Sequence, residues 1–70
     1  MVEVFKTNVA SPDHAGLLLG IIHETYREYR ANFDLDDCDR ILRVECPDGT
    51  VDAEELIGIL NGHGFEAETL

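Results

Sequence analysis

The first half of the chain contains a segment of alternating polarity followed by a segment of helical periodicity. Residues 2–9 alternate and are rich in β-forming side chains, which predicts a β-strand. Ser11-Pro12-Asp13 then supplies a capping hydroxyl, a proline for the first helical position and an acid for the first turn, a typical helix start. The helix that follows is predicted to end near Arg27. One face of the strand carries Phe5, Thr7 and Val9, and the apolar face of the helix carries Ala15, Leu18, Leu19, Ile22 and Tyr26.

A hairpin is predicted in the middle of the chain. Residues 29–35 and 40–46 each alternate between apolar and polar positions, as half-buried strands do. The aspartate-rich residues 36–39 lie between them and favour a turn, because aspartate readily bonds its own local backbone.

A second amphipathic helix and a last strand complete the pattern. Thr50 or Asp52 is expected to cap the helix, and Glu55 stands at capping-box spacing from Asp52. His63-Gly64 ends the helix, and residues 65–69 alternate as a short strand. The apolar stripe of this helix is Ala53, Leu56, Ile57 and Leu60.

The predicted order βαββαβ gives an α+β fold class. Two amphipathic helices packed on one face of a four-stranded antiparallel sheet form a ferredoxin-like sandwich, and the 70 residues have room for one such domain. Charged and polar side chains are expected to discourage edge-to-edge pairing of sheets. They are Arg30, Asn32 and Asp34 on one expected edge, and Glu66 and Glu68 on the other.

The net charge limits the classes of partner that can be expected, and the cysteines indicate the cellular compartment. The net charge is -10, and residues 31–70 carry most of it while residues 1–30 are nearly neutral, so neither nucleic acid nor an anionic membrane is an expected partner. The uncharged apolar stretch Ala15–Ile22 is too short to span a membrane, and no secretion signal opens the chain. Cys38 and Cys46 lie eight positions apart along a predicted strand, too far for a disulfide. Free thiols predict a cytoplasmic location.

Several features resemble the heavy-metal-associated domain, the small module of metallochaperones and metal-transporting ATPases. A strand ends at Val9 directly before a loop-to-helix junction, and Leu18 and Ile22 have the core spacing of the family. The segment His63-Gly64-Phe65-Glu66-Ala67 is similar to the start of the family's last strand. Asn32–Val44 also resembles a stretch of small bacterial proteins of this superfamily that lack an established activity. The resemblance implies the same ferredoxin-like fold.

The metal-binding motif of the family is not retained. The family binds metal through Met-x-Cys-x-x-Cys at the junction of the first strand and first helix. Here that stretch is Val9-Ala10-Ser11-Pro12-Asp13-His14, with Ser11 and His14 where the two cysteines stand. Because Cu(I) selects thiolate and thioether ligands, Cu(I) is not an expected cofactor.

Histidines offer one alternative metal site. His14 remains a strong donor in the first loop, and the resemblance puts His63 near the same end of the sheet. With Asp13 they would bind Zn²⁺ or Ni²⁺ weakly, because imidazole suits both ions. The alternative is that His14 is a polar first-turn residue and His63 a helix-terminal one that interacts with the helix dipole.

The acidic hairpin Asp34–Asp39 offers another candidate metal site. Asp34, Asp36 and Glu45 match positions of an EF-hand loop. However, Cys38 replaces an oxygen ligand, Asp39 replaces the turn glycine, and strands rather than helices are expected on both sides. A weak divalent site and a solvated turn both remain open.

The outer face of the first helix is the predicted interaction surface. Gly16 and Gly20 each cost about 1 kcal/mol relative to alanine, and a strip without side chains lets another backbone approach. Together with Leu17, Ile21 and His23 they would contact an unknown protein partner or a second copy of the chain. Simple tolerance of glycine is the alternative.

These observations predict a protein that is not an enzyme. Ser11, Asp13 and His14 are spaced as a helix cap rather than as a catalytic triad. The expected function is that of a protein-interaction or regulatory module with a degenerate metal-binding loop. The alternatives are a metal-ion-binding protein that uses His14 and His63 or the Asp34–Asp39 hairpin, and a small-molecule regulatory domain of the ACT type.

Overall fold

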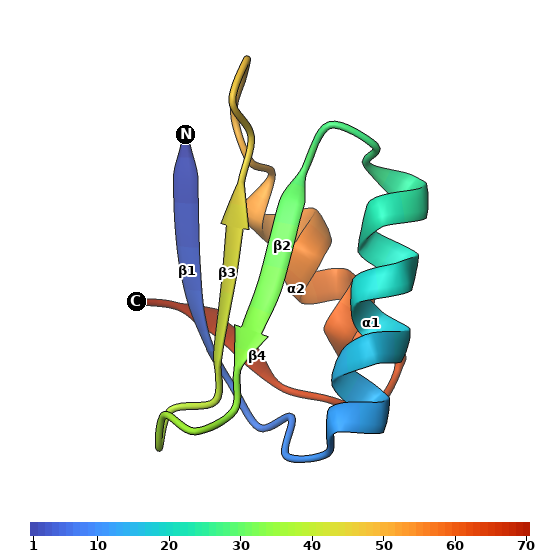
Figure 1. The fold of residues 1–70 in the computed structure, drawn as a ribbon, viewed down its shortest axis with the longest axis vertical. Helices are drawn as coiled ribbons and strands as arrows, with labels where there is room; N and C mark the ends of the chain where they lie inside the picture. Colours follow the sequence, from blue (N-terminus) through green and yellow to red (C-terminus); the bar gives the residue numbers. More distant parts are fainter.

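A computed structural model describes residues 1–70 and shows six elements in the order βαββαβ. The four strands form one antiparallel sheet in the order β2-β3-β1-β4, and both helices lie on the same side of it (Figure 1). This confirms the predicted ferredoxin-like fold. Neither helix is long and apolar enough to cross a membrane. The elements are β1 (Val2–Thr7), α1 (Pro12–Thr25), β2 (Arg30–Asp34), β3 (Ile41–Glu45), α2 (Ala53–Gly62) and β4 (Ala67–Thr69).

The core lies between the sheet and the two helices. Most of its members come from the predicted apolar faces of the strands and helices, where Leu18, Ile22, Leu56 and Leu60 are all fully buried. Val51, in the loop before α2, was not predicted. Thr7 is the one buried polar residue. The apolar core residues are Phe5, Val9, Ala15, Leu18, Ile22, Leu42, Val44, Cys46, Val51, Leu56 and Leu60.

Both predicted helix caps form, although the second differs from a full capping box. The Ser11 hydroxyl accepts a hydrogen bond from the Asp13 N–H at 3.2 Å. Asp52, rather than Thr50, caps α2, and its carboxylate accepts from the Glu55 N–H at 3.1 Å. The reciprocal bond of a capping box is absent, because the Asp52 N–H donates to the Tyr29 hydroxyl at 2.9 Å. The carboxylate of Glu55 accepts a hydrogen bond from the Tyr26 hydroxyl instead.

Regular strand structure is shorter than predicted where β1 and β4 meet the helices. β1 ends at Thr7 instead of residue 9, and β4 begins at Ala67 instead of residue 65. The ladder is interrupted because Asn8 bonds Glu66 partly through its side chain: Asn8 Oδ1 accepts from the Glu66 N–H at 2.8 Å, and the Asn8 N–H donates to the Glu66 carbonyl at 3.3 Å.

Candidate functional site

The loop between β1 and α1 is the place where the resemblance puts a metal site. Ser11 caps α1 with its side chain, and the backbone of Val9 is held by the Thr7 hydroxyl, which accepts its N–H at 3.2 Å. The imidazole of His14 packs on the ring of Phe65, with centroids 5.3 Å apart and planes tilted by 58°. The polar groups of this loop therefore take part in helix capping and packing.

His63 occupies the end of α2. It is the C-terminal cap residue, and its Nδ1 lies 3.3 Å from the Ile59 carbonyl oxygen. The contact of His14 with Phe65 places the first histidine against the segment that follows His63, as the resemblance implied. The structure does not gather Asp13, His14 and His63 into a group of three donor atoms within 4.8 Å. The histidine metal site stays a prediction.

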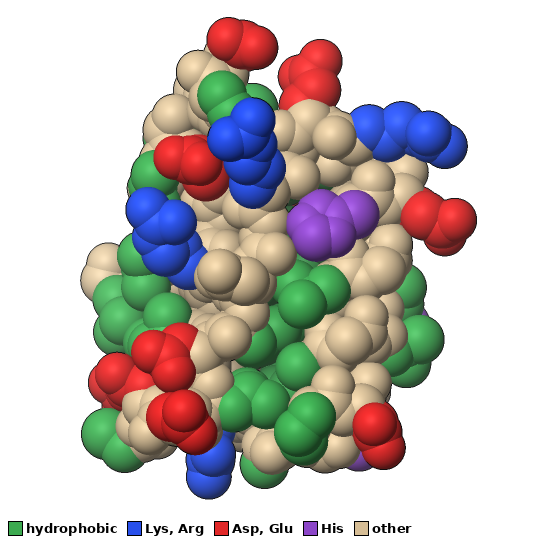
Figure 2. Space-filling view, in the orientation of Figure 1, with side chains coloured by type: hydrophobic (Ala, Val, Ile, Leu, Met, Phe, Trp, Pro, Cys, Tyr) green, Lys and Arg blue, Asp and Glu red, His purple; other side chains and the backbone are tan.

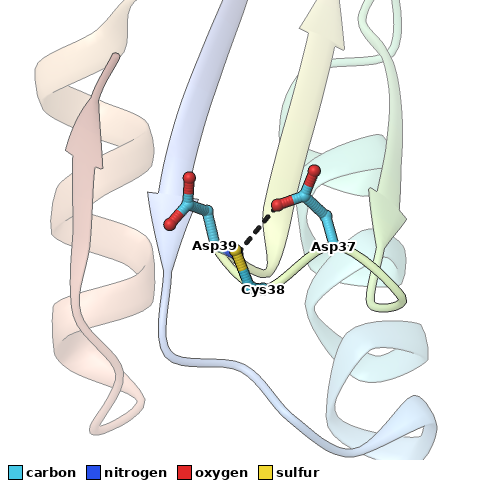
Figure 3. Close-up of side chains that lie close together, drawn as sticks. All are labelled: Asp37, Cys38 and Asp39. Atoms are coloured by element: carbon cyan, nitrogen blue, oxygen red, sulfur yellow. Dashed lines mark hydrogen bonds between the residues drawn. The ribbon is translucent and has the colours of Figure 1, made fainter.

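Three donor atoms do converge at the tip of the β2–β3 hairpin. The carboxylates of Asp37 and Asp39 flank the thiol of Cys38 (Figure 3), and one donor atom from each residue lies within 4.8 Å of the others. Asp37 Oδ1 also accepts the Asp39 N–H at 2.8 Å. Cys38 is exposed and unbridged, and Asp34, which the sequence grouped with these residues, lies within β2. The hairpin is flanked by strands, so it is not an EF-hand.

The tip of this hairpin is fixed to the end of β1. The Thr7 hydroxyl donates to the Arg40 carbonyl at 2.5 Å, and the Thr7 N–H donates to the Asp39 carbonyl at 3.1 Å. Lys6 Nζ lies 3.9 Å from Asp39 Oδ1, the one ion pair of the structure. Arg40 turns the chain with a φ of 48°, and its guanidinium donates to the Leu35 carbonyl at 2.7 Å. The position of the acidic cluster is therefore set by hydrogen bonds to backbone carbonyls more than by the ion pair.

The outer face of α1 is open. A Cβ added at Gly16 or Gly20 would meet nothing within 4 Å, and Leu17 exposes 57% of its surface. Ile21 is half-buried. His23 is exposed, but it lies on the flank of the helix toward β2, where its Nε2 accepts the N–H of Ala31 at 3.1 Å. The sequence placed His23 on the outer face and did not predict this bond.

Sequence reasoning also missed a contact between the two helices. The Tyr26 hydroxyl donates to the Glu55 carboxylate, and the ring of Tyr26 stacks on Tyr29 with centroids 4.7 Å apart. The hydrogen bond to Glu55 and, second, burial raise the pKa of Tyr26 to about 12. The sequence separation of 29 residues leaves no local signal for this pair.

Neither of the two recesses of the structure is lined mainly by hydrophobic residues. The recess beside β4 is lined by seven residues, of which only Ala67 is hydrophobic. Ligand pockets are usually lined by apolar and aromatic side chains. Nothing in this geometry favours the ACT-type alternative.

Two solved structures of other proteins superimpose on this chain over nearly its whole length. No protein-family model and no curated protein matches the sequence. A gold-binding protein of known structure superimposes with a TM-score of 0.79 at 17% identity, over 97% of this chain and 98% of its own. A trimeric Cu1 form of a mutant copper chaperone Atx1 from Synechocystis PCC6803 gives a TM-score of 0.69 at 13% identity, over the same shares of the two chains. The chain shares the ferredoxin-like βαββαβ fold of these two proteins. At these identities the likeness extends to the fold alone, so it confirms the architecture that the sequence predicted and leaves the metal loop to be judged on its own residues.

Proposed function

We propose that this heavy-metal-associated-like domain is non-enzymatic, has lost the soft-metal site of its first loop, and works as a protein-interaction or regulatory module. The observation that carries the proposal is the use of the β1–α1 loop. Ser11 caps α1 and His14 packs on Phe65, so neither of the two positions that correspond to metal-binding cysteines offers a thiolate. Cu(I) and similar soft ions need such ligands.

The contact surface in this proposal is the outer face of α1. Leu17 is the most exposed large apolar residue outside the chain ends, and Gly16 and Gly20 leave the backbone beside it uncovered. The surrounding half of the chain, residues 1–30, is nearly neutral in a molecule of net charge -10. The expected partner is therefore a protein whose contact surface is apolar and close in shape to a helix, and whose charge is not strongly negative.

Paired variants test this surface. Leu17→Gln and Gly20→Gln cover or remove the exposed apolar strip, and Gly58→Gln is the matched control, because Gly58 is an exposed glycine of α2 with equally open surroundings. A partner protein isolated with the wild-type domain should then bind, in purified form, to wild type and Gly58→Gln but at least about tenfold more weakly to the α1 variants. Equal affinity for all four proteins would contradict the assignment to α1.

A divalent metal ion at the hairpin tip is the second candidate function. It is favoured by the convergence of Asp37, Cys38 and Asp39, and two solved proteins of this fold are described as binding gold and copper. Carboxylate oxygens suit hard divalent ions, while one thiolate adds affinity for zinc.

Native mass spectrometry after exposure to Zn²⁺, Ni²⁺ or Ca²⁺ separates the two candidates. A stoichiometric adduct that is lost in Asp37→Asn and Asp39→Asn but kept in Asp36→Asn favours the hairpin site, because Asp36 is an exposed neighbour outside the group. A joint shift of the His14 and His63 imidazole resonances during a Zn²⁺ titration would place the ion at the histidines instead. Absence of any adduct leaves protein interaction as the function.

A further inference from the structure

β2 is an open edge of the sheet, and one hydrogen bond reveals which of its backbone groups face outward. The Ala31 N–H donates to His23 rather than to β3. Backbone groups of an antiparallel strand alternate in direction, so Arg30, Asn32 and Asp34 exchange hydrogen bonds with β3. The backbone groups of Ala31 and Phe33 therefore face outward, away from the sheet.

The side chains of this strand are self-complementary. The sequence Arg30-Ala31-Asn32-Phe33-Asp34 carries opposite charges at equal distances from Asn32. If two copies pair antiparallel about Asn32, each Arg30 lies opposite Asp34 of the partner subunit, in a pair without direct backbone bonds, where side chains are closest. In the same register Ala31 and Phe33 form the hydrogen-bonded pairs, which matches their outward backbone groups. One register thus satisfies charges and backbone together.

The charges around β2 also favour contact with a second copy of the chain. Three of the five basic residues of the chain lie on or next to it: Arg27, Arg30 and Arg43, the last directly opposite Asn32. Figure 2 shows basic and acidic side chains interspersed in the upper part of this face and a hydrophobic band between β2 and α1. Two molecules of net charge -10 therefore repel each other less when they meet at this edge than when they meet at a surface that carries only acidic residues.

The opposite edge lacks these properties. β4 has only three residues, and antiparallel pairing with its own copy would bring Glu66 and Glu68 against carboxylates. Like charges directly opposite destabilise strand pairs. The charges of β4 therefore oppose edge-to-edge pairing, whereas the two charges of β2 have opposite sign and do not.

We propose that a second copy of this chain pairs with β2 in antiparallel register centred on Asn32, joining two four-stranded sheets into one sheet of eight strands. His23 regulates this edge, since its ring occupies the Ala31 N–H and must turn away before the strands pair. The proposal goes beyond the interaction function above, because it names a different surface and the chain itself as partner.

Charge reversal tests the register. Arg30→Asp puts like charges together at both ends of the paired strands, and so does Asp34→Arg. Each variant alone should raise the dimer dissociation constant by about tenfold or more in sedimentation velocity. An equimolar mixture of the two variants restores both attractive pairs, because the introduced aspartate then faces the introduced arginine, and it should form heterodimers with wild-type affinity. Lys6→Asp is the matched control: it changes the net charge equally, but Lys6 is an exposed residue of β1, two strands away from β2.

A second measurement locates the contact. In hydrogen exchange, the Phe33 amide should be exposed in dilute protein and become protected as concentration rises, and His23→Ala should strengthen dimerisation several-fold. A wild-type chain that stays monomeric at all concentrations overturns the proposal. So does a dimer that Arg30→Asp and Lys6→Asp weaken equally, or one in which the mixture gives no rescue. Leu17→Gln is expected to leave this dimer unchanged, which separates the outcome from that for the α1 surface.

Discussion

The hydroxyl of Tyr26 donates a hydrogen bond to the carboxylate of Glu55, and this bond links the C-cap residue of α1 to the first turn of α2. The two helices have no other side-chain hydrogen bond between them in the structure. A protonated phenol is required as the donor, so the bond to Glu55 is the main reason for the raised pKa of Tyr26.

This linkage predicts that stability falls at alkaline pH. The pKa of Tyr26 rises from 10.0 to about 12 on folding, so between these values the folded chain holds a proton that the unfolded chain has lost. The free energy of unfolding contributed by Tyr26 is therefore complete below pH 10 and is lost as pH increases toward 12. Urea unfolding of wild type and Tyr26→Phe should converge across this interval.

Tyrosinate absorbance provides the control for this prediction. Tyr29→Phe keeps the stacked ring and leaves Tyr26 as the only tyrosine, so its titration is read directly. Glu55→Gln removes the charged acceptor and should lower the pKa of Tyr26 toward its ordinary value. A Tyr26 that titrates identically with and without the Glu55 carboxylate would show that the bond does not persist in solution.

Thr7→Val is predicted to destabilise the fold through the hairpin. Valine fills the same volume, but the Arg40 carbonyl loses its donor and the buried Val9 N–H loses its acceptor. An unsatisfied buried polar group costs about 1–3 kcal/mol. Chemical denaturation should show a loss of this size.

The matched control is Thr69→Val in β4, because Thr69 is exposed and its side chain makes no hydrogen bond in the structure. A change within about 0.5 kcal/mol is expected there. If the two valine variants are equally stable, the Thr7 hydroxyl does not hold the hairpin to β1.

Local features of this fold were predictable from sequence, and the contacts that join distant segments were not. Ser11 and Asp52 cap their helices as predicted, because capping depends on residues within one helical turn. Glu55 has capping-box spacing, yet its carboxylate binds Tyr26, since tertiary packing offered a phenol within reach. Thr7 did carry a signal, because a polar residue between Phe5 and Val9 on a core-facing strand must find a partner.

The candidate site was predicted less well for a related reason. The sequence grouped Asp34 with the acidic hairpin, whereas strand alternation sends it to the open face of the sheet and leaves Asp37 and Asp39 beside Cys38. The distance between His14 and His63 depends on how α2 packs against the first loop, and neither local pattern encodes that packing. His23 was assigned from a helical wheel alone, which contains no information on the neighbouring strand.

Two glycine-to-alanine substitutions are predicted to act in opposite directions. Neither Gly16 nor Gly64 has an atom within 4 Å of an added Cβ, so only backbone conformation differs. Gly64 has a φ of +88°, where alanine is strained, and Gly64→Ala should cost about 1–2 kcal/mol. Gly16 is helical, and Gly16→Ala should stabilise by up to about 1 kcal/mol in thermal or urea unfolding. A loss of stability in Gly16→Ala would indicate that the outer face of α1 is covered in solution.

Restoring two thiols should restore soft-metal binding if the first loop is a degenerate metal loop. Ser11→Cys combined with His14→Cys puts thiolates at the two positions where the resemblance places them, and thiolates are the ligands that Cu(I) selects. Cys38→Ser is included in every protein compared, because the hairpin tip carrying this exposed thiol is bonded to the end of β1. Native mass spectrometry should then show a stoichiometric Cu(I) adduct for the double variant.

The Ser11→Cys single variant, which supplies one thiolate, is the matched control and should bind far more weakly. The loss of the Ser11 cap costs about 1 kcal/mol in both variants, so it cannot account for a difference between them. A double variant that binds Cu(I) no better than the single one would mean that this loop does not present its side chains as a metal loop, and the assignment of a lost site would be wrong.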